Sequence, residues 1–327
     1  MRAAVVTRFG DPDVFAVTEQ EDPPPGRGEV AVAVEVADTL WVETQIRSGA
    51  GRDYWPMRPP YVPGNGVAGR VAAVGEGVDP ALRGAAVVAH TGNEGGYADR
   101  AVVAVDAVSL VPDGVDLTVA AALLHDGPTA LALFDVTKVG ADDAVVVVGA
   151  SGGLGIASVQ LARARAARVV AVARGAKLDR IRTLRPDATV DSESANWVEQ
   201  VRSALPDGGA DVVLDNIGGA LGEAALALVG RGGRFSGHGT PSGRFAAVDR
   251  DAAACDGITV TGIETVQMSP ADLKRYTDQA LREAAAGVLA PVIGQTFPLE
   301  RVADAHAAIE ARTVFGKTLV TTLGAGR

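Results

Sequence analysis

A glycine-rich segment near the middle of the chain has the residue types and spacing of a dinucleotide-binding loop. The run 144–148 is a predicted buried strand, and Ala150-x-Gly152-x-x-Gly155 follows it with alanine in place of the first glycine of the fingerprint. Gly152 would let the backbone approach a pyrophosphate, and Gly155 would let the next helix pack on the strand. The alternative is a tight strand–helix turn without a ligand. We expect cofactor contacts at Ala150, Ser151, Gly152, Gly153, Leu154 and Gly155.

Basic residues after the next predicted strand favour NADPH over NADH. An acidic residue there would accept hydrogen bonds from the ribose 2′-hydroxyl of NAD. This chain has Arg174 and Lys177 instead, although both would also be ordinary as solvated surface charges. Gly237 and His238 follow another strand, and ligands bind at the carboxyl ends of parallel strands, so we expect this loop to contact the cofactor through its backbone.

The elements that would position these residues alternate between strand and helix. Apolar runs predict strands at 144–148, 169–173, 212–215, 234–237 and 258–263, and helical spacing predicts helices near 154–165, 177–185, 194–204 and 220–229. This alternation predicts a doubly wound parallel sheet.

The first hundred or so residues follow a different pattern. Short β-branched runs at 3–6, 30–36, 67–74, 85–89 and 101–105 are punctuated by glycine and proline, which predicts a mainly antiparallel β domain. After Met268, an amphipathic helix over 270–286 and a last strand over 316–321 indicate a return to this domain. We therefore predict an α/β protein with one domain formed by residues 1–121 and 267–327 and a second formed by residues 122–266.

Composition excludes several classes of protein. Hydrophobic residues make up 47% of the 327 residues and charged residues 21%, which fits a globular protein and excludes a mostly disordered one. The net charge of −10 argues against nucleic acid and anionic membranes as partners. The single Cys255 cannot form an internal disulfide or a thiolate-based metal site. Because no apolar run has the length of a secretory signal or a membrane span, we expect a cytoplasmic protein.

Several motifs together carry a family resemblance over nearly the whole chain. They are the segments 1–12, 46–49 (Ile-Arg-Ser-Gly), 95–98 (Gly-Gly-Tyr-Ala), 149–155, 215–219 (Asp-Asn-Ile-Gly-Gly), 291–299 and Gly316-Lys317. The chain thus resembles the quinone oxidoreductase (zeta-crystallin-like) branch of the medium-chain dehydrogenase/reductase superfamily. The resemblance implies a GroES-like catalytic domain made from both termini, a Rossmann domain that binds NADPH, and a homodimer paired through the sheet edge near 258–263. It also implies cofactor contacts at Thr129, Asn216 and Lys317, with a turn cap as the alternative for Asn216.

The resemblance also exposes departures from the superfamily. Its zinc alcohol dehydrogenases carry Gly-His-Glu where this chain has Gly64-Asn65-Gly66, and Asn65 cannot replace an imidazole ligand. We therefore expect no metal and no zinc mechanism. The family segment Gly-Val-Asn-Pro-x-Asp appears here as residues 38–43, with Leu40 in place of the asparagine. Leu40, Trp41 and Asn65 are expected to shape an apolar acceptor pocket, with core packing as the alternative for Trp41.

NADPH without a metal suits hydride delivery to an electron-poor carbon, either of a quinone or of an α,β-unsaturated carbonyl. An enone also needs a proton on its α-carbon. Tyr54 is one candidate donor because related enoyl reductases place a tyrosine in this loop; packing against Trp55 is the alternative. His125, beside the region expected to hold the nicotinamide, is the other, with a hydrogen-bonded histidine at a helix start as the alternative. Glu43 and Arg47, one helical turn apart, are expected to form an ion pair.

These observations predict a zinc-independent, NADPH-dependent reductase of a small electrophile, a quinone or an α,β-unsaturated carbonyl. A pathway-specific enoyl or polyketide reductase is an alternative, favoured by the replaced pocket residues. A non-catalytic NADPH-binding protein is another, and it predicts cofactor binding without turnover of any acceptor.

Overall fold

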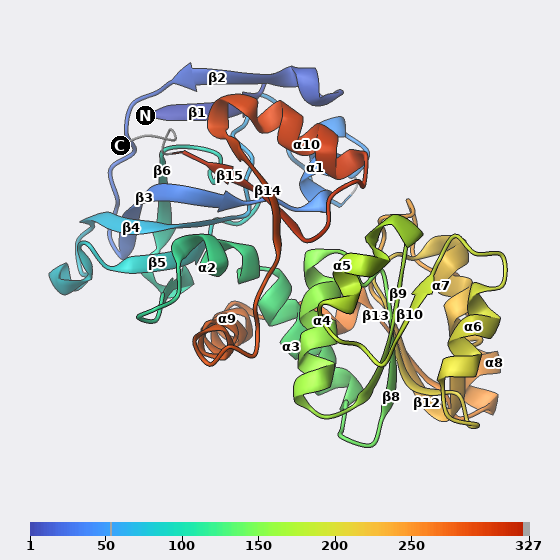
Figure 1. Cartoon of the computed structure of the whole chain (residues 1–327). Helices are drawn as coiled ribbons and strands as arrows, with labels where there is room; N and C mark the ends of the chain where they lie inside the picture. The colour runs from blue at the N-terminus through green and yellow to red at the C-terminus, as the bar shows by residue number, and fades with distance from the viewer. Residues whose placement is uncertain (53, 323–327) are drawn as a thin grey trace. The chain divides into compact units, whose positions relative to one another are not determined.

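The computed structural model describes residues 1–52 and 54–322. The chain forms two compact units (Figure 1). The first consists of Met1–His125, Pro270–Ala285 and Pro291–Arg327, and the second of Asp126–Ser269 and Ala286–Ala290.

The β-branched runs of the first unit form a mainly antiparallel sheet. Strand β3 (Glu29–Asp38) pairs antiparallel with β4 (Gly66–Val74), β6 (Arg100–Ala104) and β15 (Lys317–Thr321). The order is β14-β15-β3-β4-β5-β7, with β5 (Ala86–His90), β7 (Val108–Leu110) and β14 (Ile293–Pro298), and only β14 and β15 run parallel. A separate hairpin joins β1 (Arg2–Val6) to β2 (Phe15–Glu19).

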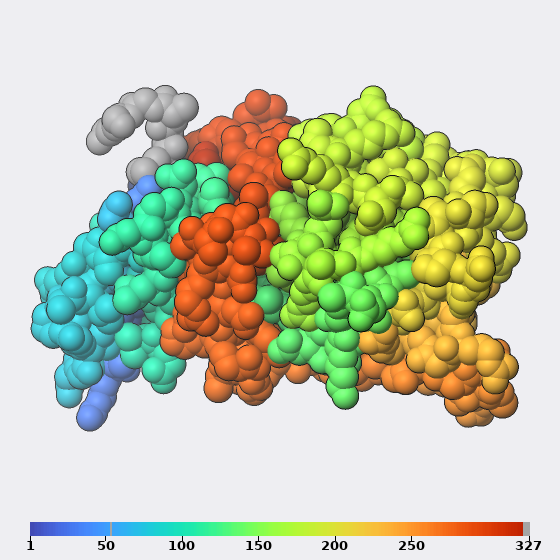
Figure 2. All heavy atoms as spheres, turned by 60° about the horizontal axis from the view of Figure 1, so that its bottom comes forward, coloured from blue at the N-terminus to red at the C-terminus, as the bar shows by residue number. Residues whose placement is uncertain are grey.

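Four α-helices complete the first unit: α1 (Trp41–Ser48), α2 (Leu117–Leu123), α9 (Pro270–Ala285) and α10 (Val302–Glu310). Short 3-10 turns are η1 (Pro12–Val14), η2 (Pro80–Leu82), η3 (Val105–Ala107) and η6 (Leu299–Arg301). The buried alanines 120–122 let α2 lie close against β3, β4 and β5. Helix α9 packs on α2 and β7, and its orange spheres lie beside the teal ones of the β7 region in Figure 2.

The second unit is built on a six-stranded parallel sheet of order β10-β9-β8-β11-β12-β13. Its strands are β8 (Ala144–Val148), β9 (Arg168–Ala173), β10 (Ala188–Asp191), β11 (Ala210–Asp215), β12 (Val229–Gly237) and β13 (Thr259–Gly262). Chain order reverses between β8 and β11, which is the switch point of a doubly wound sheet. Every residue of β8 is buried, as its run of valines predicts for a central strand.

Helices flank this sheet: α3 (Asp126–Thr137), α4 (Gly153–Ala164), α5 (Leu178–Arg182), α6 (Trp197–Ala204), α7 (Gly219–Leu226) and α8 (Arg250–Cys255), with turns η4 (Gly175–Lys177) and η5 (Ile263–Val266). The predicted fold class is confirmed, with a GroES-like, mainly antiparallel unit and a Rossmann-type, doubly wound parallel sheet. The short strand β10 and helix α8 were not predicted.

No helix within residues 1–52 and 54–322 is by itself long and apolar enough to cross a membrane; α2 and α3 would qualify only as a pair with a 44° bend, judged by length and composition alone.

Candidate active site

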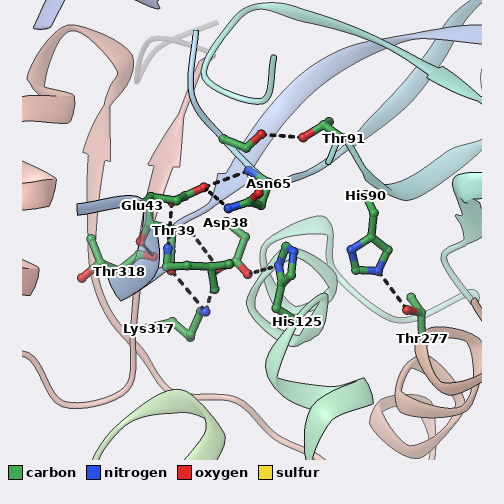
Figure 3. Close-up of polar contacts among 12 residues, drawn as sticks. Asp38, Thr39, Glu43, Asn65, His90, Thr91, His125, Thr277, Lys317 and Thr318 are labelled. Atoms are coloured by element: carbon green, nitrogen blue, oxygen red, sulfur yellow. Dashed lines mark hydrogen bonds and ion pairs between the residues drawn. The ribbon is translucent and has the colours of Figure 1, made fainter. Parts of the chain in front are cut away.

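The ends of several strands in the first unit bring together polar side chains that lie far apart in the sequence. Asp38 ends β3 and His90 ends β5, whereas Gly66 begins β4 and Lys317 begins β15. Because β3 runs antiparallel to β4 and β15, and β4 antiparallel to β5, all of these positions lie at one edge of the sheet. His125 follows α2, which packs on the same strands. Figure 3 shows the resulting cluster.

A buried carboxylate links this cluster. Asp38 Oδ2 accepts a hydrogen bond from His125 Nδ1 at 2.8 Å. Asp38 Oδ1 forms an ion pair with Lys317 Nζ at 2.8 Å and accepts the Thr39 N–H at 2.8 Å. Burial by itself raises the pKa of Asp38, but the Lys317 charge and the His125 hydrogen bond outweigh it and hold that pKa below its ordinary value. Asp38 is therefore ionised. Its side chain is fully enclosed, whereas the His125 side chain is 20% exposed.

His90 lies against His125 as a neutral side chain. The two rings meet edge to face, with centroids 4.9 Å apart. His90 Nε2 lies 3.1 Å from Thr277 Oγ1, and that hydroxyl donates its one proton to the Leu273 carbonyl oxygen, so Nε2 must be the donor. Burial, followed by the neighbouring His125, lowers the pKa of His90 to about 3. His90 therefore places no positive charge next to His125.

Glycine at position 66 makes room for the His125 ring. A Cβ atom built there would lie 2.8 Å from His125 Cε1 and 2.4 Å from Leu124 Cδ2, closer than side chains approach one another. Gly66 therefore leaves the space that the imidazole occupies. It stands at the position of the glutamate in the zinc signature.

The expected Glu43–Arg47 ion pair is wrong. Glu43 is the third residue of α1 and turns back toward the helix start, where its carboxylate accepts the Leu40 N–H at 2.8 Å, as in half of a capping box. Arg47 is buried and pairs instead with Glu310 of α10. The spacing along the helix was compatible with a pair, but the unsatisfied amide at the helix start competes for the same carboxylate.

Glu43 is the centre of a second buried cluster. Besides Leu40, it accepts the Tyr97 hydroxyl at 2.5 Å and the Asn65 N–H and Nδ2 at 2.8 and 3.1 Å. Burial, against these hydrogen bonds, raises the pKa of Glu43. Tyr97 also lies 3.2 Å from His306 Nε2, and burial lowers the pKa of His306 to about 3. This cluster is closed to solvent throughout.

The predicted acceptor-pocket residues separate into two kinds. Leu40 and Trp41 are half-buried at the start of α1, whereas Asn65 is buried with its amide directed at Glu43. Tyr54 lies in the loop after α1, 83% exposed, with its ring 5.9 Å from that of Trp55. The structure therefore brings Leu40 and Asn65 together through Glu43 and leaves Tyr54 on an open loop.

The residues at the zinc signature do not fit zinc. Asn65 holds its amide against the Glu43 carboxylate, which offers no metal an imidazole nitrogen. Across the described ranges 1–52 and 54–322, no group of three His, Cys, Asp or Glu side chains is placed to hold a metal ion.

In the second unit, the loop between β8 and α4 has the backbone that its glycines predict. Gly149 has φ = +77°, a conformation that side chains disfavour. A Cβ at Gly155 would lie 2.3 Å from the Gly149 carbonyl oxygen, so helix and strand could not approach with any larger residue. At Gly152, the helix N-cap, the nearest atom to such a Cβ is 4.0 Å away. The loop thus leaves an approach to the first amides of α4, which have no partner within the helix.

Basic side chains gather at the carboxyl end of β9. Arg174 precedes η4, Lys177 is its last residue, and Arg180 follows one turn later in α5. Burial, together with the charges of Arg174 and Arg180, lowers the pKa of Lys177. Glu193 offsets part of this charge, 3.9 Å from Arg174 Nε. Such a cluster of mutually repelling cations favours a bound anion, which fits a 2′-phosphate.

The polar residues after β11 and β12 hold the strand ends together. Asn216 Nδ2 donates to the Val148 carbonyl oxygen at 2.8 Å, and its Oδ1 lies 3.0 Å from His238 Nε2. His238 Nδ1 lies 3.1 Å from Ser236 Oγ, and burial lowers the pKa of His238 to about 4. Both side chains are therefore engaged within the unit, and the His238 and Gly239 N–H groups both donate to the Asp215 carbonyl oxygen, at 3.3 and 2.9 Å.

The remaining predicted cofactor residues lie in different surroundings. Thr129 is half-buried in the first turn of α3. Gly237 ends β12 and lines a cavity of about 270 Å³ next to Phe245 and β13. Lys317 is buried in the first unit, with its ammonium on Asp38 and 3.3 Å from the Thr39 carbonyl oxygen.

Sequence reasoning missed Asp38 as a site residue. The available signal was its place in the motif, because the family has glycine where this chain carries an acid at the end of a buried strand. A charged residue in that position needs partners, and His125 and Lys317 supply them from 87 and 279 residues away in sequence.

Comparison with known proteins places these features among oxidoreductases. A family model described as zinc-binding dehydrogenase matches residues 184–320. The rat quinone oxidoreductase is 31% identical over 94% of this chain and 93% of its own length. A mycobacterial protein solved in complex with NADPH superposes with a TM-score of 0.87 at 28% identity, covering 98% of this chain and 99% of that one. A structure named as an NAD-dependent alcohol dehydrogenase has a TM-score of 0.89 at 28% identity, covering 98% and 100%.

Proposed function

Because the chain belongs to the quinone oxidoreductase family of the medium-chain dehydrogenase/reductase superfamily, we propose that it reduces an α,β-unsaturated carbonyl or a quinone with NADPH. The observation that carries the proposal is a partly exposed histidine, His125, held by an ionised and buried aspartate, Asp38. A reductase of this kind needs a positioned acid as well as a cofactor.

The second unit supplies the residues that would hold NADPH. The loop of residues 150–155 offers backbone amides to the pyrophosphate, and Arg174 and Lys177 offer positive charge to the 2′-phosphate. Asn216, Gly237, His238 and Thr129 are further proposed contacts, the first three through strand ends that the Asn216–His238 hydrogen bond holds rigid. When bound, NADPH would supply a hydride, that is, one proton together with two electrons, to the acceptor.

The first unit supplies the proton. For an enone, a C–H bond forms at the β-carbon, and the electron pair of the C=C bond moves onto the carbonyl to give an enolate. His125 then gives a proton to the α-carbon, which restores the C=O bond, and the imidazole regains its proton from solvent through its exposed part. For a quinone, the corresponding proton goes to a carbonyl oxygen, and the O–H proton of the product exchanges readily with water.

Tyr54 remains a second candidate donor. Its hydroxyl lies on an exposed loop, beside Trp55 rather than within a hydrogen-bonded cluster that would orient it. His125 is favoured because its Nδ1 is held by a buried partner, Asp38, and its ring packs edge to face on His90. The two assignments differ in which substitution, Tyr54→Phe or His125→Gln, removes enone turnover.

The proposed roles of the two domains follow from these residues. We assign catalysis to the first unit, with Leu40, Trp41 and Asn65 shaping the acceptor pocket, and cofactor binding to the second. A homodimer through β13 is also proposed, because this strand forms the sheet edge and the exposed Ile263 follows it. Light scattering after size exclusion would test it, with Ile263→Asp expected to lower the measured mass toward that of a single chain.

The activity is tested by anaerobic NADPH oxidation with the purified, metal-free protein against quinones, enones and enoyl thioesters, with NADH in parallel. Turnover of one class assigns the acceptor. Tight binding of NADPH without consumption by any acceptor would overturn the proposed activity and leave a binding protein.

A further inference from the structure

We propose that Asp38 is a positioning residue, which fixes the ring orientation and protonation pattern of His125 so that the proton is delivered from Nε2. The proposal rests on the function proposed above. It assigns a role to a residue at which the family motif has glycine, and to three interacting side chains, Asp38, His125 and Lys317, that the motifs do not predict.

The hydrogen bond between His125 and Asp38 determines which ring nitrogen carries a proton. An ionised carboxylate can only accept, so the contact of 2.8 Å places a proton on His125 Nδ1. Any proton that His125 transfers must then come from Nε2. After transfer, the ring is the neutral Nδ1–H form, which is the form that Asp38 stabilises.

Asp38 is itself held in place. Lys317 Nζ and the Thr39 N–H both bind Oδ1, which leaves Oδ2 for His125. Lys317 also lies 3.3 Å from the Thr39 carbonyl oxygen, and Thr39 Oγ1 donates to the Thr318 carbonyl oxygen at 2.5 Å. Lys317 at the start of β15 and Thr39 directly after β3 thus hold the Asp38 carboxylate through Oδ1, and Figure 3 shows these labelled residues together.

The other contacts of the His125 ring restrain it without supplying charge. His90 meets it edge to face and is neutral, with its Nε2 proton directed at Thr277. Gly66 lies against Cε1 and admits no side chain there. Titratable and charged groups near His125 include Asp38 from β3, Lys317 from β15 and His90 from β5, together with its sequence neighbour Asp126.

The arrangement separates burial from access. Asp38 and Lys317 are enclosed, so their pairing is not screened by solvent, whereas one-fifth of the His125 side chain reaches the surface. The exposed imidazole is the part that can meet a substrate and recover a proton from water.

The decisive variant is Asp38→Asn, which keeps the shape but replaces one carboxylate oxygen with an amide donor. The amide can turn its NH2 toward His125, and the ring proton then moves from Nδ1 to Nε2. We expect kcat for enones to fall at least 100-fold with the Kd for NADPH within twofold of wild type. Asp99→Asn is the matched control, since Asp99 is also a paired carboxylate of the first unit, bound to Arg2, and it should leave kcat unchanged.

A spectroscopic readout accompanies the kinetics. The chain has four histidines, so ¹⁵N labelling gives few imidazole signals, and His125→Gln identifies the one of interest. In the free wild-type protein at a pH where His125 is neutral, its Nδ1 should carry the proton. In Asp38→Asn, the Nε2–H form should gain population, which a merely structural role for Asp38 does not require.

If Asp38→Asn fails to fold because Lys317 is left unpaired, the double variant Asp38→Asn/Lys317→Gln removes both charges, and the same fall in kcat and the same change of the His125 tautomer are expected. Unchanged kcat together with an unchanged His125 tautomer in a folded variant would overturn the positioning role while leaving the proposed function intact. Absence of turnover in the wild-type protein with every acceptor would instead overturn the proposed function, and this proposal with it.

Discussion

Two clusters in the first unit each contain an acid and a histidine, and they differ in access to solvent. Asp38 binds His125, which is 20% exposed. Glu43 binds Tyr97, which contacts the fully buried His306. Similar residue types therefore serve two purposes. The enclosed cluster connects α1, the loop before β4 and α10, whereas the partly open one presents an imidazole that can exchange a proton.

The electrostatics differ in the same way. Asp38 has two cationic or potentially cationic partners and a pKa held below its ordinary value, whereas burial raises the pKa of Glu43, whose donors are neutral. The Asp38 carboxylate contacts the His125 ring directly and can stabilise its imidazolium form. The Glu43 carboxylate contacts no imidazole directly, because Tyr97 lies between it and His306. We therefore expect substitutions in the first cluster to change catalysis and substitutions in the second to change stability.

The largest effect is expected for His125→Gln. Loss of a positioned acid typically slows a reaction about 10²- to 10⁴-fold, and kcat for enones should fall within that range. Because the Gln side chain keeps an N–H donor for Asp38 Oδ2, thermal stability should fall less than in Glu43→Ala. Steady-state kinetics and a melting curve on the same preparation test both statements. A small loss of activity with a large loss of stability would place His125 with the structural cluster.

The opposite outcome is expected for Glu43→Ala. It leaves the Tyr97 hydroxyl, the Leu40 N–H and two Asn65 donors without their acceptor, so the free energy of unfolding should fall by roughly 3–5 kcal/mol. Urea unfolding measures this. A control is Glu193→Ala, because Glu193 is exposed and its ion pair with Arg174 should contribute little to stability. Equal effects of the two substitutions would contradict the account.

Gly66→Ala should lower both enone turnover and the free energy of unfolding. The added methyl would lie 2.8 Å from His125 Cε1, so the ring or Leu124 must shift, at a cost of about 1–3 kcal/mol in stability. Misplacement of the proton donor should also lower enone turnover about tenfold or more. Gly77→Ala provides a control glycine with no atom near its would-be Cβ, although its φ of +82° carries its own strain. Unchanged turnover in a stable Gly66→Ala protein would disconnect ring placement from catalysis.

Cofactor choice should respond to Arg174→Ala. Loss of one charge from the group around Lys177 should weaken NADPH about tenfold and leave NADH nearly unchanged. Fluorescence titration with each nucleotide measures the ratio of the two Kd values. Equal weakening of both would refute a 2′-phosphate contact at this position.

Buried neutral histidines predict a modest acid dependence of stability. The pKa of His306 falls from 6.5 to about 3 on folding, so between these values the unfolded chain binds more protons. Its contribution is constant above pH 6.5, and stability is lost as pH falls below that value. Urea midpoints from pH 8 to pH 5 should therefore slope less steeply in His306→Gln than in wild type. The slope of the variant is compared with that of wild type because other buried groups also titrate. Burial raises the pKa of Glu43 and of Asp215, so their effect on stability changes with pH in the direction opposite to that of His306. Parallel slopes would contradict it.

The two units also differ in how far sequence predicts them. The β8–α4 loop could be predicted because its requirements are local, as Gly149 needs a positive φ and Gly155 a close approach of strand and helix. The Asp38 cluster could not, because its members become neighbours only when antiparallel pairing brings the ends of β3 and β5 and the start of β15 to one edge. His125 was predicted as a candidate, but its partner was not.

Local competition explains the error at Glu43. Helical spacing pointed to Arg47, and the unsatisfied Leu40 amide decided where the carboxylate went. Helix 177–185 was predicted as one element, whereas η4 occupies its start and α5 ends at Arg182. Such boundaries depend on tertiary contacts rather than on periodicity.

The central claim is that the protein delivers a proton to a carbon from a fixed direction. It is tested most directly by reducing a 2-alkyl enone with NADPH in D2O and measuring the enantiomer ratio and deuterium content at the new α-carbon early in the reaction. The account predicts one enantiomer, deuterated at the α-carbon, from the wild-type protein, and a slow reaction with loss of this preference in His125→Gln. A racemic product from the wild-type protein, or an unchanged rate and ratio in the variant, would contradict it.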